Sequence, residues 1–194
     1  MSREPQVERA TDAAVAAGTL TAGFMADPVM RWIFDTPQKY LTGFPRFAAA
    51  MHGAAFAHDM TFQVGDHAGV AIWLPPGVQG DSEGVVAAIQ DKVAPEKMPE
   101  MFEIAAQVGG AHPDYPHWYL PWLAVDPARQ SQGLGARLMK HSLRIVDESG
   151  LPAWLESPNP RNIPFYERHG FEVVGRTQTA TAPPIHWMLR PGRG

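Results

Sequence analysis

Apolar residues in the first half of the chain recur with two spacings, one typical of helices and one typical of strands. Within residues 16–24 they lie four positions apart, which predicts a helix that Thr11 or Asp12 caps and that ends at Asp27. The runs 60–64 and 69–75 are rich in β-branched and aromatic residues and predict two strands. Gly65 and Asp66 lie between these runs as the turn of an antiparallel hairpin.

Proline and glycine divide the rest of this half into short elements. The chain has 19 prolines and 18 glycines, and residues of these two types end or interrupt helices. The further predicted elements are a short strand at 6–9, a helical stretch at 40–56 that Gly43 and Pro45 weaken, and a helical stretch at 82–108 that Pro95 and Pro99 interrupt and Gly109–Gly110 end.

The second half has a clearer order, beginning with the apolar run HWYLPWLAV at 117–125, which predicts a buried central strand. Pro121 within this run has no backbone N–H to donate, so it predicts a bulge or a point where the strand parts from a neighbour. A helix to about Ser149 and a strand at 153–157 follow, and this order predicts a parallel crossover. The last predicted elements are a short helix at 162–170 and strands at 171–176 and 185–189.

These patterns predict a mixed α/β (α+β) fold, with a twisted, mostly antiparallel sheet that is split at the central strand and flanked by helices. A length of 194 residues predicts one domain, and a net charge of −4 lacks the basic excess of a nucleic-acid-binding protein. Without cysteine there is no disulfide, thiolate metal site or cysteine nucleophile, and the eight histidines lack the spacing of a metal-binding helix motif. The N-terminal segment fits neither a signal peptide nor a membrane span, so we expect a cytoplasmic protein with no membrane partner.

The segment QSQGLGAR at 130–137 places two glycines just before the predicted helix of the crossover. Glycines let a backbone approach phosphate oxygens closely, and the N-terminus of a helix offers free N–H groups, although two glycines also suit an ordinary tight turn. A nucleotide P-loop would need Gly-Lys-Ser/Thr, and a dinucleotide site would need a third glycine where Leu138 stands. Only 38 residues follow Glu156, too few for the second half of a dinucleotide-binding domain.

The sequence around this segment resembles that of the GNAT superfamily of N-acetyltransferases. The resemblance rests on Val125-Asp126-Pro127, on the pattern Gln130-x-x-Gly133-x-Gly135, and on LESPNPRNIPFYERHGFEVVG at 155–175. The resemblance covers residues 117–190. Within the superfamily, we expect the nearest similarity to the enzymes that acetylate puromycin. Residues 1–116 align only loosely, so we expect them to be a variable half that faces the acceptor.

The resemblance implies acetyl-coenzyme A as the donor and a primary amine of a small molecule as the acceptor. It also implies three groups of cofactor contacts, namely a splayed strand, a loop whose backbone N–H groups hold the pyrophosphate, and the following helix. These residues are Leu123, Ala124 and Val125 in the strand, Gln130, Ser131, Gln132, Gly133, Leu134, Gly135 and Ala136 in the loop, and Asn162 and Phe165 in the helix.

Acetyl transfer to an amine needs a base for the ammonium, a donor to the carbonyl oxygen and an acid for the leaving thiolate. The resemblance assigns the acid to Tyr166 and the base to Glu156, and a strand N–H within 123–125 would bind the carbonyl oxygen. Without the resemblance, the pattern favours a packing role for Tyr166, and Glu156 would be a solvated charge at the end of a strand or an ion-pair partner of Arg161 or Arg168.

Several alternatives stay open at this level. A non-catalytic module that binds acyl-coenzyme A would keep the glycine loop without needing either catalytic residue, and an enzyme acting on protein amines would keep both. His117 and Trp118 could wall an acceptor pocket, and an amine could be attracted by Asp27, Asp35 or Asp59. The chain is compatible with a monomer or a homodimer.

Overall fold

The computed structural model describes residues 5–90 and 92–193, in which seven strands form one sheet. The order along the sheet is β1-β2-β3-β4-β5-β7-β6, and every neighbouring pair is antiparallel except β4 and β5. The predicted mixed, mostly antiparallel sheet with one parallel crossover is therefore confirmed. The strands are β1 (Val7–Arg9), β2 (Thr61–Val64), β3 (Gly69–Leu74), β4 (Trp118–Val125), β5 (Ala153–Ser157), β6 (Glu172–Arg176) and β7 (His186–Arg190).

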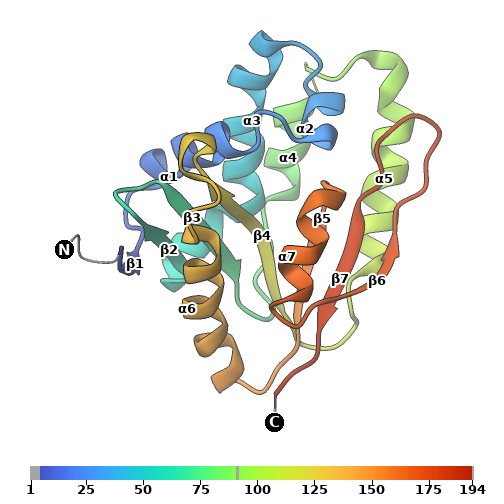
Figure 1. Ribbon diagram of the computed structural model, residues 1–194. Helices are drawn as coiled ribbons and strands as arrows, with labels where there is room; N and C mark the ends of the chain where they lie inside the picture. The colour runs from blue at the N-terminus through green and yellow to red at the C-terminus, as the bar shows by residue number, and fades with distance from the viewer. Residues whose placement is uncertain (1–4, 91, 194) are drawn as a thin grey trace.

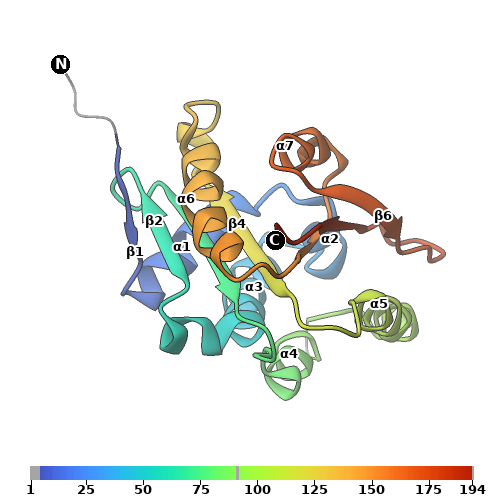
Figure 2. The same cartoon turned by 90° about the horizontal axis from the view of Figure 1, so that it is seen from below.

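Helices cover both faces of this sheet (Figures 1 and 2). Seen from below, α6 and α7 lie on one face, and α3, α4 and α5 lie on the other (Figure 2). Within the described residues, no helix is long and apolar enough to cross a membrane. The helices are α1 (Ala13–Gly23), α2 (Pro28–Ile33), α3 (Pro37–His52), α4 (Ser82–Ile89), α5 (Met98–Ala111), α6 (Leu134–Glu148) and α7 (Ile163–Glu167).

The first helix is shorter than the sequence pattern predicts, and a second helix follows it. Asp12 caps α1 by accepting the N–H groups of Ala14 and Val15, but α1 ends at Gly23. Asp27 then caps a separate helix, α2, whose first residue is proline. Proline has no N–H and a fixed φ, so it suits the first turn of a helix, and Asp27–Pro28 marks a beginning where we had expected only an end.

Proline in the first turn also explains where two later helices begin, at Met98 and at Pro37. Pro99 lies in the first turn of α5 and does not interrupt it, and Gly109 and Gly110 are the last residues of α5 before Ala111. The predicted stretch 40–56 is a helix that begins at Pro37, tolerates Pro45 and gives way to a 3-10 turn after His52.

Strand β4 contains both irregularities that Pro121 predicts. Its pairing with β3 runs from Gly69↔Val125 to Ile72↔Trp122 and resumes at Leu74↔Tyr119, so Leu120 and Pro121 together oppose Trp73 as a bulge. β4 pairs with β5 only at Trp118↔Ala153 and Tyr119↔Trp154. Beyond Tyr119 the backbone edge of β4 that faces β5 has no strand partner among the described residues.

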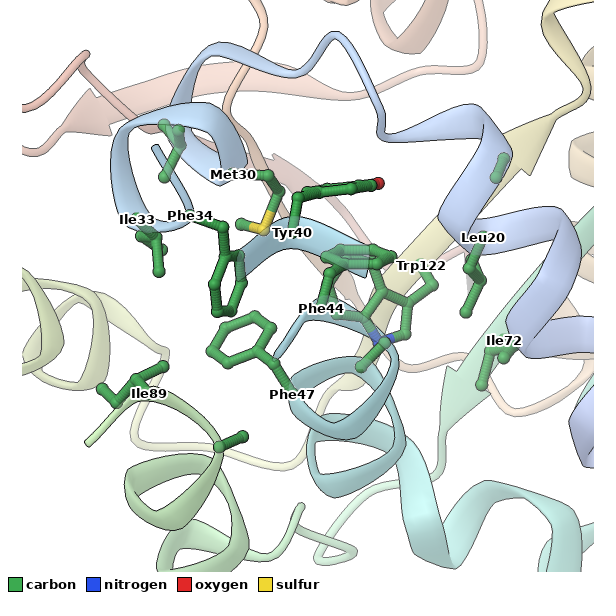
Figure 3. Packing of buried hydrophobic residues seen from close by; sticks show 14 of the residues in the cluster. Leu20, Met30, Ile33, Phe34, Tyr40, Phe44, Phe47, Ile72, Ile89 and Trp122 are labelled. Atoms are coloured by element: carbon green, nitrogen blue, oxygen red, sulfur yellow. The ribbon is translucent and has the colours of Figure 1, made fainter. Parts of the chain in front are cut away.

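An aromatic cluster holds α1 and α3 against β4 next to this split (Figure 3). The Trp122 ring meets those of Phe24, Phe44 and Phe47 with centroids 5.0, 5.5 and 6.2 Å away. At Gly23 an added Cβ would lie 2.8 Å from the Cβ of Ala124, so α1 crosses β4 at close range. This packing fixes the link between α1 and α2 beside the parted strand.

Candidate active site

The loop between β4 and α6 is folded by its own polar side chains. Asp126 accepts the N–H of Ala128, and the Gln130 amide donates to the carbonyl oxygen of Val125 at 3.2 Å. Arg129 Nε donates to Gln132 Oε1 at 3.1 Å. Two of the side chains that we expected near the cofactor, Gln130 and Gln132, are thus engaged in shaping the loop.

The backbone of the same loop leaves a row of N–H groups free. None of the N–H groups from 131 to 136 donates to another described residue. Ser131 and Gly133 have φ values of 62° and 78°, in the left-handed region, and Gly133 is the N-cap of α6. Alternating backbone conformations of this kind, followed by a helix N-terminus, form a concave set of donors that binds anions. The loop therefore fits the pyrophosphate of coenzyme A.

Three predicted cofactor contacts from different segments meet at the first turn of α6. A Cβ added at Gly135 would lie 3.6 Å from the Phe165 ring and 3.7 Å from Val125 Cγ2. Leu134 beneath the loop is 2% exposed and anchors it to the apolar cluster under α6. Asn162 is exposed at the start of α7, and its side chain makes no cap hydrogen bond.

Tyr166 lies in the apolar cluster on the α6 side of the sheet. Its ring is 5.2 Å from that of Phe165 and 6.1 Å from that of Phe171. Its hydroxyl donates to no described residue, and it is not among the buried polar atoms that lack a partner, so it reaches accessible space. Burial, and secondarily the charge of Asp27, raises the pKa of this phenol, so it stays a neutral donor.

Glu156 points to the opposite face of the sheet, because its strand neighbour Leu155 belongs to the α6 cluster. Its Oε1 atom accepts the indole N–H of Trp154 and lies 2.9 Å from Nε2 of His112, which follows α5. The hydroxyl of Tyr119 also faces this carboxylate. Burial, the negative charge of Glu156 and a hydrogen bond to it raise the pKa of Tyr119, so this hydroxyl is a further donor.

A second histidine extends this group away from Glu156. His112 Nδ1 lies 3.1 Å from His117 Nε2, and His117 Nδ1 lies 2.8 Å from the carbonyl oxygen of Tyr115. The sequence directed attention to Glu156 and His117 but not to His112 or Tyr119. Tyr119 and Glu156 could have been linked through alternate positions of adjacent strands, whereas no spacing signal connects His112 with β5.

Of the three acids considered for the amine, only Asp27 is buried. Asp35 pairs with Lys39 at 2.9 Å, and Asp59 pairs with Arg9 at the surface. Asp27 is 7% exposed and caps α2, and burial raises its pKa from 3.8 to about 6 despite two backbone hydrogen bonds. A hollow of about 430 Å³ lies beside it, lined by Ala26, Pro28, Pro158, Asn159, Pro160, Arg161, Pro183 and Pro184.

The raised pKa of Asp27 makes stability depend on pH. A folded-state pKa above the unfolded value means that the folded protein holds more protons, so stability falls as pH rises from about 3.8 to about 6. Asp27→Asn keeps an equally good cap and should stabilise the protein at pH 7 by roughly 2 kcal/mol, with little effect at pH 4. Urea denaturation at both pH values measures the difference.

Asp81 provides the matched control, because it caps α4 from an exposed position. Asp81→Asn should change stability little at either pH. An Asp27→Asn variant that is no more stable at pH 7 than at pH 4, relative to wild type, would contradict the buried charge.

The link between β6 and β7 is held by hydrogen bonds to α5. Glu100 of α5 accepts the N–H and hydroxyl of Thr181 and the N–H of Ala182, at 2.6 to 2.8 Å. Gln107 of α5 bonds both ways with the backbone of Gln178. The position of this link is therefore set by α5, an element of the half that we expected to face the acceptor.

Comparisons with known proteins agree with this geometry. Residues 73–171, just over half of the chain, match the Acetyltransferase (GNAT) family. An uncharacterised N-acetyltransferase of Schizosaccharomyces pombe is 27% identical over 93% of this chain and 80% of its own length.

Two solved structures have the same fold. One, from Corynebacterium glutamicum and described as histone acetyltransferase HPA2 and related acetyltransferase, has a TM-score of 0.68 and 21% identity, covering 99% of this chain and 98% of its own. The other, arylalkylamine N-acetyltransferase 2 from Aedes aegypti, has a TM-score of 0.64 and 12% identity, covering 97% and 99%. The chain therefore belongs to the GNAT family and is an acetyl-coenzyme A-dependent N-acetyltransferase.

Proposed function

We propose that the protein transfers the acetyl group of acetyl-coenzyme A to a primary amine of a small molecule, by direct attack in a ternary complex. The divergence of β4 and β5 beyond Tyr119 and Trp154 carries this proposal. The point where the two strands part lies between the free N–H groups at the start of α6 and the carboxylate of Glu156 on the opposite face of the sheet. A donor bound on one face and an acceptor bound on the other would meet at the split.

Residues 117–190 hold the donor in this proposal, and residues 1–116 supply the acceptor side. Backbone groups of Leu123, Ala124 and Val125 would pair with the pantetheine arm along the open edge of β4. The N–H groups of 131–136 would take the pyrophosphate, with Asn162 and Phe165 along the same path. Acetyl-coenzyme A supplies the thioester whose acetyl group is transferred.

Three roles complete the reaction. Glu156 receives a proton from the acceptor ammonium, so that the free amine can attack the acetyl carbonyl carbon. A backbone N–H within 123–125 donates to the carbonyl oxygen as that oxygen gains negative charge. The Tyr166 hydroxyl gives its proton to the departing sulfur, and the raised pKa of the phenol keeps that proton in place until then. The attacking nitrogen loses its second proton as the amide forms, and this proton returns to the Tyr166 oxygen.

Asp27 and the proline-lined hollow beside it support a small acceptor. A buried carboxylate attracts an ammonium group, and the half-open hollow of about 430 Å³ has room for a small amine. The resemblance to puromycin-acetylating enzymes adds aminonucleosides to the candidate acceptors. We place the enzyme in the cytoplasm as a monomer or homodimer.

A thiol-release screen tests the proposal. Acetyl-coenzyme A is incubated with aminonucleosides, arylalkylamines, polyamines, amino acids and lysine peptides, and free coenzyme A is measured. We expect turnover with a small amine and little with peptides. Turnover with peptides alone would replace the small-molecule acceptor by a protein amine.

The acid is tested by Tyr166→Phe, which keeps the ring in the apolar cluster and removes only the hydroxyl. We expect kcat to fall by about 100-fold, a typical contribution of general acid catalysis. Because the pKa of the phenol is raised, wild-type activity should not fall between pH 7 and about 9 through loss of this proton. Tyr115→Phe, at an exposed side chain, is the control, and equal rates for the two variants would refute the assignment.

A further inference from the structure

We propose that His112 and His117 form a relay that takes the acceptor's proton from Glu156 and releases it to solvent. The proposal rests on the function given above, and it names two residues that act beyond the base. The contacts form one continuous line, from Glu156 Oε1 to His112 Nε2 at 2.9 Å, from His112 Nδ1 to His117 Nε2 at 3.1 Å, and from His117 Nδ1 to the Tyr115 carbonyl oxygen at 2.8 Å.

The three hydrogen bonds along this line determine how many protons the two histidine rings carry. The Tyr115 carbonyl only accepts, so His117 Nδ1 must carry a hydrogen. An ionised Glu156 also only accepts, so His112 Nε2 must carry one as well. The contact between the two rings needs a third hydrogen. Two neutral imidazoles have two hydrogens in total, so the three contacts are all satisfied only when the pair has gained one proton.

The arrangement therefore accommodates the proton that acetyl transfer must remove. One N–H bond of the ammonium breaks, one N–H bond forms on the histidine pair, and the Glu156 carboxylate passes the proton and ends ionised. The positive charge moves from the acceptor to the two imidazoles, so the total charge is unchanged. With its charge removed, the amine is free to attack.

The solvent exposure of the side chains rises along this line away from Glu156, which indicates the direction in which the proton leaves. The Glu156 side chain is 11% exposed and that of His112 is 25% exposed, while His117 and Tyr115 lie on the segment before β4, where Tyr115 is 47% exposed. The other groups facing the line are the Tyr119 hydroxyl, which the raised pKa keeps neutral, and the Trp154 indole. Neither of these can take the proton, so solvent beyond His117 is the exit.

His117→Gln tests the relay without removing its contact. The glutamine amide can still donate to His112 Nδ1, but it cannot carry an extra proton. With an amine that wild type acetylates, at a pH where that amine is mostly charged, we expect kcat to fall about 10-fold or more. Imidazole added to the buffer should restore much of the rate, and KM for acetyl-coenzyme A should stay unchanged. His58→Gln, on an exposed histidine outside the line, should match wild type.

The outcomes separate the relay from the proposed function. If wild type acetylates no amine in the screen, the proposed function fails before the relay is tested. If wild type is active and His117→Gln keeps its kcat, or loses it without rescue by imidazole, the relay is wrong while the function stands. Ring ¹⁵N spectra of the free wild-type protein add a test without turnover, since the relay requires both rings to share one titration and independent titrations would overturn it.

Discussion

Gly133→Val should abolish coenzyme A binding and leave the fold in place. Gly133 has a φ of 78°, and a β-branched residue is strained in that region by about 1 to 3 kcal/mol. Valine would therefore rotate the backbone at the N-cap of α6 and turn the N–H groups of 131–136 away from one another. Its side chain would also occupy the open space beside Gly133, where no atom lies within 4 Å of an added Cβ. We expect the Kd for coenzyme A, measured by calorimetry, to rise at least about 100-fold, as for the loss of two or more charge-assisted hydrogen bonds.

Gly77 provides a closely matched control for this strain. It has a φ of 80°, an added Cβ would also meet nothing within 4 Å, and it lies after β3, outside the loop. Gly77→Val should lower the melting temperature about as much as Gly133→Val while leaving the Kd for coenzyme A unchanged. Equal affinities in the two variants would show that the loop does not hold the pyrophosphate.

The backbone features that we propose for binding the donor could be predicted because their determinants are local. Pro121 has no N–H to donate to a neighbouring strand in any context. The structure contains both features that this predicts, a bulge against β3 and the separation of β4 from β5. Gly133 and the start of α6 lie within a few residues of each other, so their joint geometry follows from short-range rules. The positive φ at Gly133 and the free N–H groups are consequences of that short segment alone.

The contacts that we propose for the acceptor side could not be predicted in the same way, because they join distant segments. His112 reaches Glu156 only through the tertiary position of α5, which Glu100 and Gln107 tie to the link between β6 and β7, and 44 positions separate His112 from Glu156 in sequence. Asp27 illustrates a second limit, since Asp-Pro signals both the end of one helix and the start of another. The pattern indicated a break there, and only the packing of α2 decides that the chain resumes a helix at once.

The two catalytic candidates also lie on different faces of the sheet, which their order in sequence does not reveal. Tyr166 belongs to the cluster under α6, and Glu156 faces Tyr119 and His112. A proton acceptor on one face and a proton donor on the other suit a reaction in which the amine approaches from one side and the thiolate leaves on the other. This arrangement gives separate tests, because a change on either face should leave ligand binding on the opposite face intact.

Glu156→Gln should lower kcat by about 100-fold or more near neutral pH, the range expected for loss of a general base. The amide has nearly the same shape but cannot accept the ammonium proton, and it leaves His112 and Tyr119 without the charge they face. The difference in rate between Glu156→Gln and wild type should depend on pH through the ionisation of the acceptor amine. At low pH nearly all of the acceptor is ammonium and needs the base, whereas at high pH free amine is abundant. The rate of the variant should therefore approach that of wild type as pH rises. Initial rates from pH 6 to 10 measure this, with Glu172→Gln on the exposed face of β6 as the control. A loss that is the same at every pH would assign Glu156 to holding the site together and not to removing the proton.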